Sequence, residues 1–149
     1  MENEFILRIF IAAILGGLIG LEREYRSKEA GFRTHFLVAM GSALFMIVSA
    51  YGFGDVLMND ATSRWDVSRV AAQVVSGIGF IGAGTIIFRK SENVVSGLTT
   101  AAGLWVVAAI GLACGGGMYK LATASALLVL IGMEAFNYFL HKFDKFKKD

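Results

Sequence analysis

The sequence predicts an all-α polytopic membrane protein with five transmembrane helices, its N-terminus outside the cell and its C-terminus in the cytoplasm. Of its 149 residues, 56% are hydrophobic and 17% are charged, whereas a soluble domain carries about 25% charged residues. The apolar residues gather in five stretches, each close to the roughly 20 residues that a helix needs to cross a bilayer. Only two charged side chains, Arg8 and Glu134, fall inside them. We expect spans at about 5–21, 36–53, 70–88, 94–114 and 121–140 in a single transmembrane domain, 1–149, that ends in a basic cytoplasmic tail, 141–149.

The distribution of basic residues predicts the orientation. Ten of the 14 Lys and Arg residues lie in the 22–35 loop, the 89–93 loop or the C-terminal tail. Positively charged loops stay in the cytoplasm, so these three segments are expected there. An odd number of spans then places the N-terminus outside.

The first span begins with an acidic turn and continues beyond the bilayer. Arg8 lies one turn from its outer end, where a long side chain is able to snorkel toward water. Glu22 and Arg26 are spaced i, i+4 and favour a helix that continues into the cytoplasm, until Gly31 ends it. Small residues at Gly16 and Gly20 are typical of close packing between helices in lipid, as are Gly111 and Gly115 in the fourth span.

The third span carries a cap, one amide and a glycine-rich motif. Asp66 is placed to cap its N-terminus, with Arg69 as a partner. Gln73 must face protein or water, because an unpaired amide is costly in lipid. Its amide either makes an interhelical hydrogen bond or forms part of a polar pathway. The segment 77–82 matches G-x-G-x-x-G, but lies inside an uncharged span without the strand and acidic residue of a dinucleotide site. We therefore interpret the glycines of this region as packing residues: Gly77, Gly79, Gly82 and Gly84.

The fourth apolar segment is longer than one crossing needs. No charge occurs from Asn93 to Tyr119, and its start, 94–100, is rich in residues that form helices poorly. We expect this start to be irregular or re-entrant and the regular helix to begin near 97–100. Backbone of this kind at membrane depth requires protein or a water-filled cavity around it.

Glu134 is the most costly residue to place in a membrane. It lies six residues before the end of the fifth span, and a charge at the bilayer centre costs roughly 2.5–3.5 kcal/mol on insertion scales. It is therefore neutral, paired or in a hydrated cavity, with Arg23, Arg33 or His35 as candidate partners. A functional acid and a structural clasp are equally compatible with the sequence.

Several functional classes are excluded or weakly supported. The loops are too short for a soluble catalytic domain, so no catalytic residue and no enzyme activity are expected. The net charge of +2 does not indicate nucleic-acid binding, and Cys114 is interpreted as a small packing residue. Mg²⁺ prefers carboxylate oxygens and water, for which Glu22, Glu24 and Glu134 are weak candidates. No cofactor is otherwise predicted.

Four ordered blocks resemble the MgtC/SapB family, over about residues 9–133. They are Gly20-Leu-Glu-Arg-Glu24, Ala30-Gly-Phe-Arg-Thr-His35, the segment from Asp66 to Gly84, and Val95-Ser-Gly-Leu-Thr-Thr-Ala-Ala102 with Trp105. The resemblance assigns the family's polar motif positions to Glu22, Arg23, Glu24, Arg33, Thr34, Asp66, Arg69, Gln73, Thr99 and Thr100. The MgtC branch carries a soluble C-terminal domain that is expected to be lacking here, so the short SapB-like branch fits better.

The resemblance implies a bacterial inner-membrane protein linked to magnesium homeostasis and stress adaptation. In our leading hypothesis it is a non-enzymatic regulator of a membrane partner, a magnesium transporter or the ATP synthase. The alternative is a Mg²⁺ or proton transporter with a polar path of Gln73, Thr99, Thr100, Glu134 and Glu22 between the last three helices. A third interpretation treats these groups as structural clasps. The glycine faces also predict a homo-oligomer within the lipid bilayer.

Overall fold

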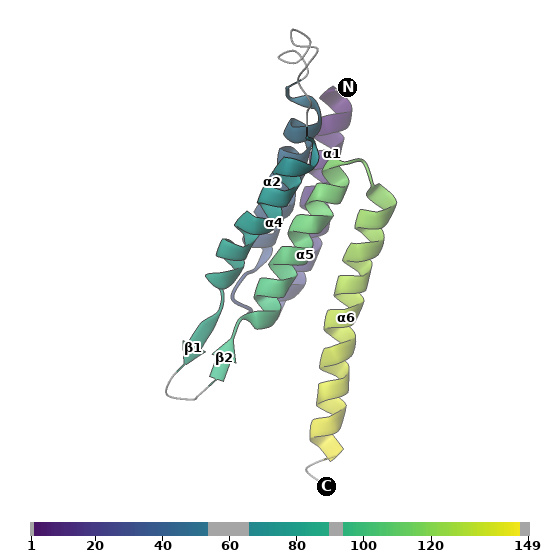
Figure 1. Cartoon of the computed structure of the whole chain (residues 1–149). Helices are drawn as coiled ribbons and strands as arrows, with labels where there is room; N and C mark the ends of the chain where they lie inside the picture. The colour runs from purple at the N-terminus through teal and green to yellow at the C-terminus, as the bar shows by residue number, and fades with distance from the viewer. Residues whose placement is uncertain (1, 54–65, 90–93, 147–149) are drawn as a thin grey trace.

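The computed structural model describes residues 2–53, 66–89 and 94–146, which form five helices and a short antiparallel hairpin (Figure 1). The helices are α1 (Glu2–Tyr25), α2 (Phe32–Tyr51), α4 (Ser68–Ala83), α5 (Leu98–Gly115) and α6 (Tyr119–Phe146). The strands β1 (Ile87–Arg89) and β2 (Val94–Ser96) pair Phe88 with Val95. Three helices, α1, α2 and α5, are long and apolar enough to cross a membrane.

The helices alternate in direction, so the connections gather at two opposite ends of the bundle (Figure 1). We call one the N-terminal end; it holds the start of α1, the end of α2 and the α5–α6 turn. The other, the hairpin end, holds the α1–α2 connection and the two strands. The described end of α6 lies at the hairpin end, opposite the start of α1 (Figure 1).

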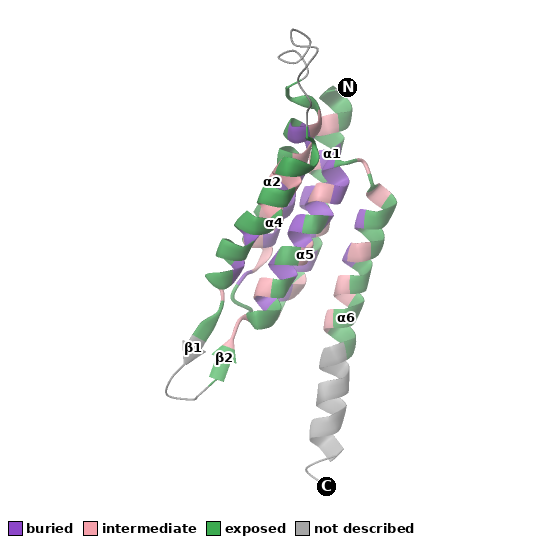
Figure 2. Ribbon diagram, viewed as in Figure 1, coloured by how far each residue is buried: buried purple, intermediate pink, exposed green. Residues whose placement is uncertain are grey.

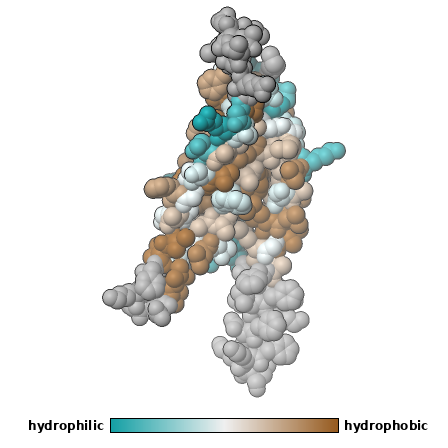
Figure 3. Space-filling model, viewed as in Figure 1, coloured by the Kyte–Doolittle hydropathy of each residue, from teal (hydrophilic) through white to brown (hydrophobic). Residues whose placement is uncertain are grey.

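Central positions in the bundle belong to α2 and α5, which pack closely against each other. The core between α1, α2, α5 and the first half of α6 is made of small and β-branched residues, including Ala12, Ala39, Val107, Cys114 and Ala122. Apolar side chains also cover most of the visible outer face (Figure 3). A surface of this kind suits lipid rather than water.

Close approach of the helices depends on glycine. A methyl group at Gly16 would lie 2.5 Å from Ala39 Cβ, and one at Gly20 would lie 2.7 Å from Phe32 Cα. From α5, a methyl group at Gly115 would lie 2.5 Å from the Ala43 carbonyl oxygen of α2. Thus α1 and α5 both place a G-x-x-x-G face against α2.

The third helix is shorter than the predicted span 70–88. It ends at Ala83, and the Thr85 hydroxyl then donates to the Gly82 carbonyl at 2.8 Å. The β-branched residues that follow, Thr85 to Ile87, favour a strand, so the chain enters the hairpin. Gly97 closes it with a φ of 86°, and a side chain there would collide with the Thr85 carbonyl. The regular helix α5 begins at Leu98, inside the predicted interval 97–100.

The other predicted ends also differ in detail. α2 begins at Phe32, so Arg33, Thr34 and His35 lie in its first turn rather than in the preceding loop. The predicted tail 141–149 continues α6 as far as Phe146, and residues 147–149 lie outside the described part. Among the side chains of α6 that the structure describes, those of residues 119–135, Ala122 and Ala126 are buried (Figure 2).

Candidate functional site

A chain of alternating charges crosses the hairpin end from α1 to α6. Glu22 receives hydrogen bonds from Arg23, one of them 2.6 Å from Nη2, and from Arg26 Nε at 3.1 Å. Arg26 Nη2 then lies 2.7 Å from both carboxylate oxygens of Glu134. We call Glu22, Arg23, Arg26 and Glu134 the ion-pair chain. Arg23 is 3% exposed, so burial makes its pairing with Glu22 necessary.

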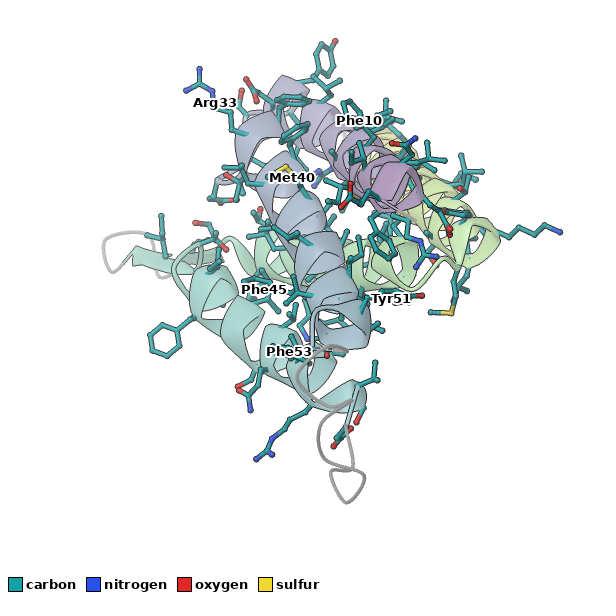
Figure 4. All side chains as sticks on the ribbon, turned by 90° about the horizontal axis from the view of Figure 1, so that it is seen from above. Phe10, Arg33, Met40, Phe45, Tyr51 and Phe53 are labelled. Atoms are coloured by element: carbon teal, nitrogen blue, oxygen red, sulfur yellow. The ribbon has the colours of Figure 1, made fainter. Side chains whose placement is uncertain are left out.

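The partner of Glu134 is therefore Arg26, which differs from the three candidates of the sequence analysis. Arg33 points away from the helices (Figure 4), and the His35 ring bonds the Gly31 carbonyl. Arg23 is occupied by Glu22. Hydrogen bonding to Glu134 raises the pKa of Arg26, so this side chain remains a cation.

Glu24 makes a different contact in the same region, with the backbone at the start of α2. Its Oε2 accepts a hydrogen bond from the Phe32 N–H at 2.8 Å, at the start of α2. A carboxylate is favourable there because the first N–H groups of a helix are unpaired and carry partial positive charge.

A second contact, which the sequence analysis missed, joins the α1–α2 connection to α5. The buried Thr100 hydroxyl donates to Glu29 Oε2 at 2.6 Å. This hydrogen bond lowers the pKa of Glu29 from its ordinary value of 4.5 because it stabilises the charged form. Thr100 alone was named from the sequence; Glu29 lies on an irregular segment whose position no periodicity predicts.

An open cavity of about 370 Å³ lies beside the ion-pair chain, between α5 and the middle of α6. Its walls include Arg23 of α1, Thr99, Gly103 and Val106 of α5, and Leu128 and Met133 of α6. We call it the α5–α6 cavity. Arg23 and Thr99, both predicted site residues, therefore face the same space.

At the N-terminal end Arg8 joins three helices. Its Nη1 donates to the Gly115 carbonyl at 2.8 Å and to the Tyr51 hydroxyl at 3.4 Å, and its Nη2 pairs with Glu4. The guanidinium carbon also lies 5.6 Å from the ring centres of Phe5 and Tyr51. Arg8 is 8% exposed, so it does not snorkel outward as the sequence suggested.

The remaining predicted residues lie on the exposed side of α4. Asp66 Oδ1 accepts from the Ser68 N–H at 3.0 Å, and these bonds to Ser68 lower the pKa of Asp66. Its described hydrogen bonds go to Ser68 and to the Arg69 backbone, and the Arg69 side chain is exposed.

Gln73 lines a largely apolar groove of about 520 Å³ between α2 and α4, into which Phe45 projects (Figure 4). A methyl group at Gly77 or Gly79 would meet nothing within 4 Å, so these glycines do not pack within the chain. A methyl group at Gly82 would make ordinary contact with Ala101, 3.5 Å from its carbonyl oxygen, and Gly84 faces the carbonyl of Ile81 on its own helix.

The three carboxylates considered for Mg²⁺ do not converge. Glu22 and Glu134 bind arginines, and Glu24 binds the start of α2. Among the described residues, no three His, Cys, Asp or Glu side chains gather in a way that would hold a metal ion. The transporter path also does not assemble within this part of the chain, since Gln73 lies on α4 apart from the ion-pair chain.

Apolar helices packed in a bundle, with ion pairs at its two ends, define the class of helical membrane proteins. The chain belongs to the MgtC family, whose model matches residues 9–142.

Relatives in other bacteria bear this out. The chain is 56% identical over 137 residues to the "Putative magnesium transporter YhiD" of Escherichia coli, covering 92% of this chain and 62% of that protein. It is 42% identical over 145 residues to "Protein SapB" of Bacillus subtilis, covering 95% and 60%. With "Protein MgtC" of Salmonella typhimurium the identity is 46% over 126 residues, covering 85% and 49%.

The chain thus spans between about half and three-fifths of the length of these relatives, and SapB too extends beyond the matched part. No solved structure matches the chain. The family match and the apolar helices together indicate a membrane protein, and the name of the Escherichia coli relative connects that relative with magnesium transport.

Proposed function

We propose that the protein is a multi-pass protein of the bacterial inner membrane, with five crossings and the hairpin end in the cytoplasm. The alternating helix directions and the basic residues at the hairpin end support this. At 16 residues α4 is about 24 Å long, so the hairpin completes its crossing at the depth of the bilayer boundary.

Labelling in intact cells tests this topology. A single cysteine introduced near the N-terminus of a Cys114→Ala background is expected to react with a membrane-impermeant maleimide, and one at Lys28 is expected to be protected. Reaction of both sites after permeabilisation is the control. Protection of the N-terminal site alone would reverse the proposed orientation.

Within that membrane we propose a non-enzymatic regulatory role in magnesium homeostasis, through contact with a membrane partner. The observation that carries this proposal is the separation of the polar groups. The ion-pair chain and the Arg8 cluster lie at opposite ends, and close-packed residues such as Ala12, Ala39 and Cys114 fill the interior between them. A conducting path would need polar groups or water along its length.

The exposed side of α4 is the surface we assign to protein contacts. Gln73 is exposed there, and Gly77 and Gly79 leave open space beside it. In lipid an amide gains a hydrogen bond, and small residues allow close approach, when another helix packs on them. A second copy of this chain, a magnesium transporter and the ATP synthase are the partners we propose for this face.

A transporter is the second candidate, and it is favoured by the name of the Escherichia coli relative. In that case the path would form only where chains meet in an oligomer. It would be lined by Gln73, Thr99, Thr100, Glu134 and Glu22.

Flux measurements separate the two candidates. In sealed liposomes with an entrapped Mg²⁺-sensitive or pH-sensitive dye, the purified protein is expected to raise the flux no higher than protein-free liposomes do. An ionophore added at the end verifies that the dye responds. Flux that is abolished by Glu134→Gln or Gln73→Leu, with the fold intact, would overturn the regulatory role. Co-purification of a transport complex that is lost with Gln73→Leu would support it.

A further inference from the structure

The α5–α6 cavity has an apolar wall and a polar inner end. Val106, Leu128 and Met133 form the wall, and Leu128 is 69% exposed, so the cavity opens on the surface that faces lipid. Among the described side chains of α6, Ala126 is the last buried one, and Val129 and Leu130 beyond it are only partly buried against the core. The Arg26–Glu134 pair still connects α6 to α1 near the polar end.

A buried hydrogen-bond acceptor lies at this inner end. His35 is fully buried, and its Nδ1 lies 2.9 Å from the Gly31 carbonyl. A carbonyl only accepts, so Nδ1 carries the proton and Nε2 keeps a lone pair. Within the described part of the chain, Nε2 has no hydrogen-bond partner.

Gly103 lines the cavity, and it has no side chain that would fill the space next to this nitrogen. A methyl group at position 103 would lie 3.8 Å from His35 Nε2 and 3.4 Å from Met133 Cε. Both Gly103 and Met133 line the cavity. A buried acceptor left without a donor costs free energy, so a ligand hydroxyl that reached it would bind favourably.

Hydrogen-bond donors are supplied by the other polar groups of the wall. Arg23 uses Nε and Nη2 for Glu22, and among the described residues none accepts from its Nη1. Thr99 adds an exposed hydroxyl. The cavity therefore offers a cationic donor, a hydroxyl and a buried acceptor next to an apolar wall.

We propose that the α5–α6 cavity binds one phospholipid whose phosphodiester is followed by a headgroup hydroxyl, as in phosphatidylglycerol. The phosphodiester accepts hydrogen bonds from Arg23 and Thr99, which are stronger than neutral ones because both the guanidinium and the phosphate are charged. The headgroup hydroxyl donates to His35 Nε2, and the acyl chains lie along Val106 and Leu128. Phosphatidylcholine has no headgroup hydroxyl and binds less well.

Native mass spectrometry of the full chain tests the site. The protein is placed in nanodiscs of equimolar phosphatidylglycerol and phosphatidylcholine with identical acyl chains, and the lipids retained per chain are counted. One phosphatidylglycerol is expected to be retained with a preference of about tenfold, the upper range for one added hydrogen bond, here from the headgroup hydroxyl to His35 Nε2. Equal retention of the two lipids would show ordinary annular lipid and overturn the proposal.

Two glycines in open space provide a matched pair of variants. A methyl group at Gly132 or at Gly41 meets nothing within 4 Å, but only Gly132 borders the α5–α6 cavity. Gly132→Leu is expected to abolish the preference, whereas Gly41→Leu is expected to keep it. Unchanged retention in Gly132→Leu would contradict the proposed location.

A second variant, Thr99→Val, removes the hydroxyl without altering the shape of the cavity. It is expected to lower the amount of lipid retained per chain severalfold while circular dichroism and elution volume stay the same, and unchanged retention would overturn its assigned role. Displacement of the retained lipid by inorganic phosphate would show that a soluble anion is the ligand, and would overturn the assignment to lipid.

Discussion

Replacing Gly111 by alanine is expected to lower the stability of the bundle by at least about 2 kcal/mol, within the range for overpacked cores. The added methyl group would collide with the Ala39 carbonyl oxygen and would lie 2.8 Å from Ser42 Cβ. The first obstacle is backbone, which has no rotamer to change, so α5 must move away from α2. Thermal unfolding of the detergent-solubilised protein, followed by intrinsic fluorescence, measures the effect.

The matched control is Gly79→Ala, on a helix whose added methyl group meets nothing within 4 Å. Its stability is expected to be unchanged or slightly higher, because alanine favours a helix more than glycine does. Equal melting temperatures for Gly111→Ala and wild type would show that α2 and α5 do not pack as closely as the structure has them.

These two glycines also illustrate what the sequence was able to predict. The G-x-x-x-G spacing at 16–20 and 111–115 identified faces for close helix packing, and both faces lie against α2. The spacing contains no information about the partner helix. The glycines of 77–82 look similar in the sequence, yet Gly77 and Gly79 lie on the surface of the chain. Local composition predicts that a face is small, and only the packing of the other helices decides whether it is covered.

Hydropathy was sufficient to predict that the helices exist. The residues at which they end and the partners in the ion pairs could be assigned only from the three-dimensional structure. Hydropathy marked 70–88 as one span, but it does not distinguish an apolar strand from an apolar helix, so the hairpin after Ala83 was missed. The irregular start before Leu98 was recognised because its β-branched residues and glycine oppose a helix. Arg26 was missed as the partner of Glu134 because the amino-acid composition of α6 does not determine how the helix is rotated about its own axis. That rotation decides which residue Glu134 faces.

Arg8→Met is expected to destabilise the protein by about 1–3 kcal/mol, the cost of leaving the buried Gly115 carbonyl without its hydrogen-bond donor. Methionine has a similar length and keeps the apolar packing of the side chain. It leaves the Gly115 carbonyl at the end of α5 without the donor at 2.8 Å, and Glu4 without its cation. The carbonyls at a helix C-terminus carry partial negative charge, so the loss weakens the junction of α1, α2 and α5 together.

Thermal unfolding of Arg8→Met, Arg8→Lys and Arg33→Met in one detergent distinguishes this role from a general loss of positive charge. Lysine restores the charge but lacks the planar fork that reaches Gly115 from Nη1 and Glu4 from Nη2 together, so we expect it to recover part of the stability. Arg33 is exposed and points away from the bundle (Figure 4), so its replacement is expected to change stability by no more than about 0.5 kcal/mol. If Arg8→Met unfolded at the same temperature as Arg33→Met, Arg8 would be a snorkelling surface residue and not the junction of three helices.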